Sequence, residues 1–273
     1  MSEIPKRPVG STDEMKKIII ICLCFIVLGN ANLLAGPFRS ITVFEHSYYL
    51  DRRTEIDWSE VMIFPLPGSF SLVTGINGKH TDDYSALGGS VGLAFNLPGQ
   101  FYGQSTYALK KYREDTIGGA TEVSSLFHSV LVEITYESAT WLFSPSVEFK
   151  FSGDYLGVMI APYLRLYPGG WGYFFIKYFG SVAEDRNELV LNNAVWTGLD
   201  LRIHPKLSIP VEGAVGSVNE AEIDGMEYTG TTGLNIWFSE KLALKYRFHY
   251  TFGESSAYNY ERIKNTLVFD LGF

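Results

Sequence analysis

The sequence predicts an all-β protein, a transmembrane antiparallel up-and-down β-barrel of about fourteen strands, with twelve strands as the alternative. Three observations lead to this fold class. Apolar residues recur at every second position over most of the chain. Turn-forming residues interrupt that alternation at short intervals. Beyond the N-terminal segment, no apolar run reaches the length of about 18 residues that a membrane-spanning helix requires.

The first 35 residues are expected to be an N-terminal extension followed by a cleaved secretory signal peptide. Residues 1–14 are polar, two lysines stand at 16–17, and an unbroken apolar run follows at 18–28. A charged start, a short apolar stretch and small residues after it are typical of a signal peptide, and the run is too short to span a membrane. Met15 is the expected true start of translation.

This interpretation leaves residues 36–273 as a single barrel domain without cysteine, because Cys22 and Cys24 both lie in the apolar run. The domain therefore has no disulfide and no cysteine metal site. The whole chain has 30 acidic and 22 basic residues and a net charge of −8, which argues against nucleic acid as a partner.

The alternation of apolar and polar residues defines the expected strands. In residues 241–252, Leu242, Leu244, Tyr246, Phe248, Tyr250 and Phe252 occupy the even positions, while the odd positions are mostly polar. A period of two places one set on each face of a strand. Residues 140–151, 155–167 and 188–204 alternate in the same way, whereas 41–51 and 54–65 alternate poorly. A barrel of twelve strands would result if those two stretches stayed outside it.

The connections between the expected strands fall into two alternating sets. Short, turn-like ones stand at 65–68, 96–99, 137–139, 168–170, 204–206 and 239–240. Longer or more acidic ones stand at 80–83, 112–123, 183–187, 219–225 and 253–258. Short periplasmic turns on one rim and longer outer loops on the other are typical of outer-membrane barrels.

The end of the chain, "NTLVFDLGF", carries a resemblance to a known class. Phe269, Leu271 and Phe273 share one face of the last expected strand. Together with the signal peptide and the alternating strands, this ending resembles that of bacterial outer-membrane β-barrel proteins. The size is also similar to that of small barrels of the YaiO-like group.

The resemblance implies several expectations. The protein would lie in the outer membrane as a monomer, in contact with membrane lipid and lipopolysaccharide. Phe273, Leu271 and Phe269 would form the signal that the barrel assembly machinery recognises. The resemblance does not assign a function, because the class contains pores, enzymes, adhesins and assembly factors.

Charged residues on the polar faces are expected to line the lumen. The predicted residues are Lys150, Arg165, Lys177, Arg202, Lys245, Arg247, Arg262, Lys264, Glu148, Asp200 and Glu212. A wet, charged lumen would pass small solutes, anionic ones included. Salt bridges among the same side chains would instead fill the lumen and make a structural barrel. Both interpretations remain open at the level of sequence.

An outer-membrane lipid-modifying or proteolytic enzyme, with its site at the outer rim, is the alternative function. His80, Asp82 and Asp83 in "KHTDDY" are similar to the acid and histidine group of outer-membrane proteases, but a solvated turn is strongly favoured over a catalytic group. The neighbours His128 and Ser129 point to opposite faces of a strand and cannot form a catalytic pair. We expect no catalytic residue, no cofactor and no metal site. A secreted soluble β protein is a third hypothesis.

Overall fold

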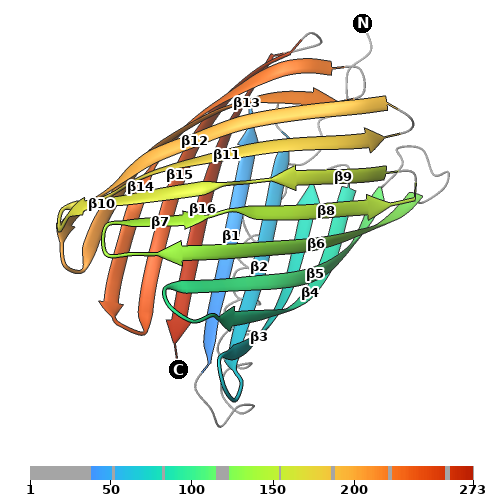
Figure 1. The fold of residues 1–273 in the computed structure, drawn as a ribbon. Helices are drawn as coiled ribbons and strands as arrows, with labels where there is room; N and C mark the ends of the chain where they lie inside the picture. The colour runs from blue at the N-terminus through green and yellow to red at the C-terminus, as the bar shows by residue number, and fades with distance from the viewer. Residues whose placement is uncertain are drawn as a thin grey trace, which may run out of the picture. The chain divides into compact units, whose positions relative to one another are not determined.

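A computed structural model describes residues 38–50, 53–81, 84–114, 123–153, 155–185, 188–220, 223–255 and 259–272 (Figure 1). The predicted signal peptide lies outside these ranges, as do Met15, Asp82, Asp83 and Phe273. Within the described ranges, no helix is long and apolar enough to cross a membrane.

The described chain is built from antiparallel strands. They are β1 (Arg39–Tyr49), β2 (Thr54–Pro65), β3 (Phe70–Thr81), β4 (Tyr84–Asn96), β5 (Phe101–Glu114), β6 (Val123–Glu137), β7 (Trp141–Ser144), β8 (Ser146–Ser152), β9 (Tyr155–Ile160), β10 (Tyr163–Gly169), β11 (Gly172–Asp185), β12 (Glu188–His204), β13 (Leu207–Glu220), β14 (Ile223–Ser239), β15 (Leu242–Ser255) and β16 (Asn259–Gly272).

The strands form one closed sheet. Consecutive strands pair along most of the sheet, and β1 pairs with β16 from Arg39↔Gly272 to Tyr49↔Arg262. Between β6 and β11 the pattern differs, because β6 pairs with both β7 and β8, β11 pairs with both β9 and β10, and β7 pairs with β10. Closure removes free sheet edges, so that the backbone groups of the wall bond to one another. β7 with β8, and β9 with β10, each form one interrupted wall strand, which gives fourteen wall strands over the described chain. The predicted fold class and its count of fourteen are confirmed. β1 and β2 belong to the wall despite their poor alternation.

Two prolines cause the interruptions. Pro145 separates β7 from β8, and Ala161 with Pro162 separates β9 from β10. The register pairs Ser144 with Tyr163 and Val147 with Ile160, so the two prolines lie opposite each other. Proline has no N–H to donate, and the ladder between these strands is broken there. The wall stays joined on either side, because the carbonyl oxygens of Pro145 and Pro162 accept from the N–H groups of Ile134 (3.2 Å) and Tyr178 (3.0 Å).

The two rims of the barrel differ less than the sequence suggests. The rim with Arg39 and Gly272, here called the terminal rim, carries all six predicted tight turns, in two of which Gly68 and Gly99 adopt φ of 85° and 82°. At the opposite rim, here called the loop rim, most of the expected loop at 112–123 lies outside the described residues, and its ends at 112–114 and 123 belong to β5 and β6. The expected loops at 183–187 and 219–225, however, consist largely of strand residues. Because these residues are polar, the sequence indicates loops, whereas the residues belong to strands of up to 17 residues.

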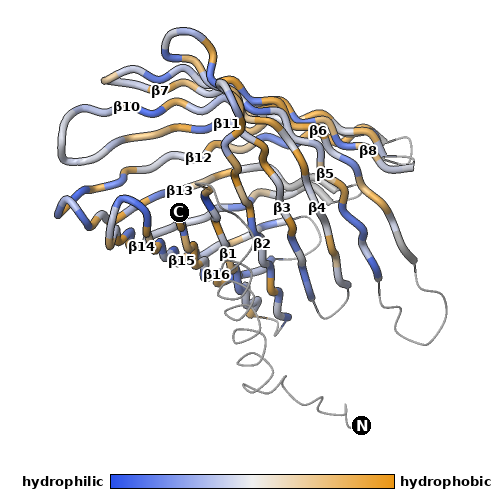
Figure 2. The backbone as a smooth tube through the Cα atoms, turned by 90° about the horizontal axis from the view of Figure 1, so that it is seen from below, coloured by the Kyte–Doolittle hydropathy of each residue, from blue (hydrophilic) through white to orange (hydrophobic). Residues whose placement is uncertain are grey.

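The outer face of the barrel is apolar and the inner face is polar. On β4, Leu87, Val91 and Leu93 are exposed outward (64%, 50% and 46%), and they alternate with small inward residues. Figure 2 shows this alternation of hydrophobic and hydrophilic residues along the strands. Thr135, Thr251 and Ser208 are among the fully buried side chains. The barrel therefore has a polar interior rather than an apolar core.

Candidate functional site

Most of the predicted lumen residues stand on the strand face that alternates with exposed apolar side chains, whereas the strand neighbours of Arg262 and Lys264 are half-buried. Lys150, for example, lies between Phe149 and Phe151, which are 45% and 40% exposed, and Lys177 lies between two similarly exposed neighbours. Arg202 is inward by the same parity, but it lies exposed near the terminal rim. The candidate site is therefore the lumen.

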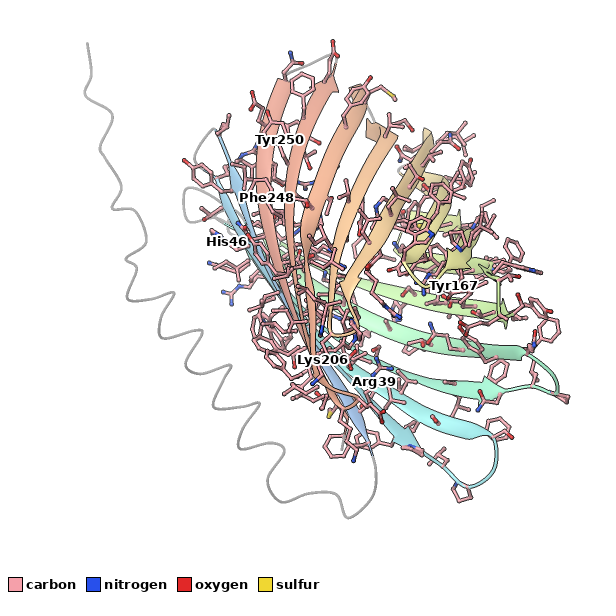
Figure 3. All side chains as sticks on the ribbon, turned by 90° about the vertical axis from the view of Figure 1, so that its left-hand side faces the viewer. Arg39, His46, Tyr167, Lys206, Phe248 and Tyr250 are labelled. Carbon is pink, nitrogen blue, oxygen red and sulfur yellow. The ribbon has the colours of Figure 1, made fainter. Side chains whose placement is uncertain are left out.

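Arg165 on β10 is held by three tyrosines. Its Nε donates to the Tyr163 hydroxyl at 2.7 Å, and Nη1 donates to the Tyr167 hydroxyl at 3.4 Å. Its guanidinium carbon lies 4.4 Å from the centre of the Tyr173 ring. Tyr167 in turn donates to Glu137 at 3.2 Å. Figure 3 labels Tyr167 on the side of the view away from the β15 residues Phe248 and Tyr250. The arginine is thus fixed by rings and hydroxyl groups rather than by a direct ion pair.

The contacts continue from Arg165 around the inner wall. Tyr173 donates to Asp200 Oδ2 at 3.2 Å, and Asn235 Nδ2 donates to the same oxygen at 2.8 Å. Arg247 Nη1 donates to Asn235 Oδ1 at 2.7 Å, and its Nε lies 3.6 Å from Glu212 Oε1. We call this group, Arg165, Tyr173, Asp200, Asn235, Arg247 and Glu212, the arginine belt. It crosses from β10 to β15 and fills that side of the lumen with ordered side chains.

The other basic residues of β15 and β16 also have acidic partners. Lys264 Nζ lies 3.2 Å from Glu45, Arg262 Nη2 lies 3.2 Å from Glu227, and Lys245 Nζ lies 3.7 Å from Asp270. Glu45 and Asp270 lie on strands adjacent to those of their lysines, whereas Glu227 on β14 is two strands away from Arg262 on β16. These short pairs neutralise much of the basic surface that the sequence places on the last two strands.

The two remaining predicted lysines differ from each other. Lys150 pairs with Glu148 on its own strand at 3.3 Å. Lys177 has no ion pair within the described ranges, and its Nζ lies 4.7 Å from the centre of the Phe179 ring. A lumen lysine that is not held in an ion pair favours anions.

The opposite side of the lumen is lined by small residues. Between Tyr84 and Asn96 at its two ends, the inward positions of β4 are Ala86, Gly88, Ser90, Gly92 and Ala94. β4 and β13 stand across the barrel from each other in the strand order, so this stripe faces the arginine belt. Space for solute therefore remains along β4, while side chains occupy the wall opposite.

Two cavities lie beside this stripe. The larger, about 480 Å³, is lined by residues of β3, β5, β6, β8 and β9, and the smaller, about 270 Å³, by residues of β1, β2, β3 and β5. Asn77 on β3 and Lys110 on β5 line both cavities. The two side chains therefore stand where the two spaces meet.

The sequence analysis did not identify Asn77 or Lys110. In "YALKKYRE", Lys110 and Lys111 are adjacent, so both faces of the strand carry a lysine and the alternation assigns neither to the lumen. Asn77 stands among apolar and glycine residues with no charge pattern. Only the strand register brings the two into one row, as Asn77↔Gly88 and Gly88↔Lys110.

An aromatic row borders the larger cavity toward the loop rim. The ring centres of Tyr84 and Tyr112 are 6.2 Å apart, those of Tyr112 and Phe127 are 5.3 Å apart, and those of Phe127 and Tyr155 are 5.6 Å apart. The row crosses β4, β5, β6 and β9. It supplies ring surface next to the charged part of the cavity.

The candidate catalytic residues do not come together in the part of the chain that the structure describes. His80 is exposed and pairs with Ser85, and its expected partners Asp82 and Asp83 lie outside the described residues. His128 Nδ1 is 2.7 Å from the Tyr107 hydroxyl, and its ring stacks on Phe151. No group of three or more His, Cys, Asp or Glu in the described ranges is arranged to hold a metal ion.

Comparisons with known proteins identify the fold. No protein-family model and no curated protein sequence match the chain. The monoaromatic hydrocarbon channel CymD matches its structure with a TM-score of 0.64 at 7% identity, over 88% of this chain and 89% of CymD. The toluene transporter TodX of Pseudomonas putida matches with a TM-score of 0.59 at 6% identity, over 88% and 90% of the two chains.

An outer membrane channel of Pseudomonas putida F1 gives a TM-score of 0.56 at 10% identity, over 89% of this chain and 97% of that one. The chain thus has the fold of solved outer-membrane β-barrels. At these identities the likeness concerns the fold alone. The similarity to YaiO-like barrels stays a prediction.

Proposed function

We propose that the protein is an outer-membrane channel that passes small solutes along the inner face of β4. The observation that carries the proposal is the pair of cavities joined at Asn77 and Lys110, beside the small residues of β4. The arginine belt occupies the opposite wall, so the solute path is a narrow one on a single side of the lumen. The solved channels of the same fold support transport as the function.

The proposed solutes are small anions. Lys110 and Lys177 are the inward lysines of the spanning strands that have no ion pair within the described ranges, whereas each inward acid of the arginine belt has a polar partner. An uncompensated positive charge in a narrow polar path attracts anions and disfavours cations. Of the two lysines, Lys110 lies beside the β4 path on β5, whereas Lys177 stands farther around the wall on β11, so the preference is expected to be modest.

We also propose where the channel lies and in which oligomeric state it acts. The exposed apolar face would contact outer-membrane lipid and lipopolysaccharide, and the barrel would act as a monomer. Phe269, Leu271 and Phe273 would form the signal for the barrel assembly machinery. Deletion of Phe273 should then lower insertion in cells while leaving refolding into detergent unchanged, measured by the heat-dependent gel mobility of the barrel. Equal loss in both assays would assign Phe273 to stability instead.

Planar-bilayer recording of the purified protein tests the channel. Wild-type protein is expected to give steady conductance in KCl, with a reversal potential of anionic sign in a salt gradient. Ser90→Trp should lower the conductance because Ser90 faces the path. Val91→Trp, its neighbour on the lipid-facing side, is the matched control and should conduct like wild type.

Two results would contradict the proposal. Folded, inserted protein that shows no conductance would make the barrel a closed structural one. Equal conductance of wild type and Ser90→Trp would place the path away from β4. No observation in the described chain favours an enzyme over a channel.

A further inference from the structure

We propose that the cavity at Asn77 and Lys110 binds a small ring-shaped carboxylate that carries a hydroxyl group. This inference rests on the proposed function, because it names the class of solute that the channel would take. Two polar groups without partners, an aromatic row and the size of the cavity support it.

Lys110 is the first of the two polar groups. Within the described chain its ammonium group has no ion pair, and its Nζ lies 5.1 Å from the centre of the Tyr112 ring. The nearby acids are engaged elsewhere: Glu148 pairs with Lys150 at 3.3 Å, and Asp57 lies 4.0 Å from Lys79. A ligand carboxylate would supply the counter-charge that the protein does not.

Asn77 is the second group. Its Oδ1 is buried and has no hydrogen-bond partner in the described chain. A buried acceptor without a donor is costly, and it calls for an explanation such as a ligand. A ligand hydroxyl would donate to this oxygen.

Gly88, on the strand between the two residues, leaves room for the Asn77 side chain. Asn77, Gly88 and Lys110 form one row across β3, β4 and β5, so the α-carbons of Asn77 and Lys110 stand about two strand spacings, or ~10 Å, apart. A Cβ on Gly88 would come within 2.8 Å of Asn77 Oδ1. The glycine therefore allows the amide to lie across β4, between the two cavities. A single molecule the size of a monosaccharide spans this distance.

The aromatic row supplies the third recognition element. Tyr112, Phe127 and Tyr155 line the larger cavity together with Asn77 and Lys110. Aromatic faces pack against flat rings and against the C–H face of sugars. The cavity volume of about 480 Å³ lies in the usual range of small-molecule sites. A ring that bears a carboxylate and a hydroxyl group satisfies all three elements.

Two sources share this chemistry, a sugar acid and a hydroxylated aromatic acid. The test is calorimetric titration of the full barrel in detergent with sodium glucuronate and with sodium 4-hydroxybenzoate. Glucose, which lacks the carboxylate, and benzoate, which lacks the hydroxyl group, are the ligand controls. At least one of the two acids is expected to bind saturably and more tightly than its control. Binding by only one acid would identify the source.

Lys110→Gln and Lys111→Gln form the matched protein pair, because the two lysines are adjacent but Lys110 is half-buried inward and Lys111 is exposed outward. Lys110→Gln is expected to lower the affinity about tenfold or more, as removal of a charge-assisted contact does, and Lys111→Gln to leave it unchanged. Wild-type protein should bind 4-hydroxybenzoate more tightly than benzoate, or glucuronate more tightly than a carboxylate without hydroxyl groups. Asn77→Ala should abolish this difference in affinity. Heat-dependent gel mobility shows whether each variant is folded.

The experiments distinguish failure of the proposed binding site from failure of the proposed channel. Conductance without saturable binding of either acid would overturn the site and keep the channel. Saturable binding that Lys110→Gln leaves unchanged would also overturn the site. Binding that depends on Lys110, in a protein without conductance, would keep the site and remove the channel.

Discussion

Arg39 and Asp270 join the first strand of the barrel to the last with two parallel hydrogen bonds. Arg39 Nε donates to Asp270 Oδ1 at 2.8 Å, and Nη2 donates to Oδ2 at 2.6 Å. Lys245 on β15 lies 3.7 Å from the same carboxylate. The Asp270 carboxylate therefore interacts with two cations, Arg39 and Lys245, where β1 and β16 close the sheet near the terminal rim.

Removal of this carboxylate should weaken the closing seam. The Arg39 side chain is 53% exposed and that of Asp270 is 12% exposed. Arg39→Ala is therefore expected to lower the free energy of unfolding by about 1 kcal/mol, as solvent-exposed pairs do. Asp270→Ala should cost about 2 kcal/mol, because it leaves two cations without their partner. Urea unfolding followed by tryptophan fluorescence measures both changes.

Lys241 is exposed at the same rim, and Lys241→Ala is the control for the substitutions of Arg39 and Asp270. A double-mutant cycle should give a coupling of about 0.5–1 kcal/mol between Arg39 and Asp270. If Asp270→Ala destabilised the barrel no more than Lys241→Ala, the contacts of Asp270 would contribute nothing to closure.

Arg247→Ala should change the charge of the lumen as well as its width. Arg247 and Glu212 are shielded, with side-chain exposures of 18% and 8%, and the truncation leaves Glu212 without its cation. The reversal potential in a KCl gradient is expected to move toward cation preference, with a higher conductance because the arginine belt is opened. Stability should fall by about 2 kcal/mol.

The double variant Arg247→Ala with Glu212→Ala separates charge from width. It should restore the wild-type reversal potential while keeping the raised conductance. A reversal potential that Arg247→Ala leaves unchanged would mean that solutes do not pass near the belt.

Gly230 and Gly233 on β14 should differ in how substitution by alanine affects the stability of the barrel. Gly230 faces outward, and a Cβ there would have no atom within 4 Å, whereas a Cβ on Gly233 would meet the carbonyl oxygen of Tyr246. Gly230→Ala should leave the free energy of unfolding within about 0.5 kcal/mol of wild type, while Gly233→Ala should lower it by about 2 kcal/mol. Urea unfolding of the two variants side by side is the measurement. Equal stabilities would show that the sheet around Gly233 relaxes freely.

Much of the fold follows from local patterns in the sequence. The period of two assigned Leu242, Leu244 and Phe248 to one face and Lys245 and Arg247 to the other, because successive side chains of a strand point to opposite sides. Proline and glycine marked the tight turns for a similarly local reason. The same signals failed where both faces carry similar residues, as at Lys110 and Lys111, and where polar strand ends resembled loops, as at 183–185.

The sequence by itself thus determined the barrel fold, and its alternation favoured fourteen strands with twelve as the alternative. The set of lumen charges that it predicts stays a prediction. Only the tertiary structure decided which charges are neutralised and which remain. Lys264 meets Glu45 across 219 positions of the chain, and Pro145 faces Pro162 through the register of two broken strands. Lys110 keeps its charge without a carboxylate because the acids around it pair with other lysines. Partners of this kind depend on the register and closure of the whole sheet, which no local pattern of residues contains.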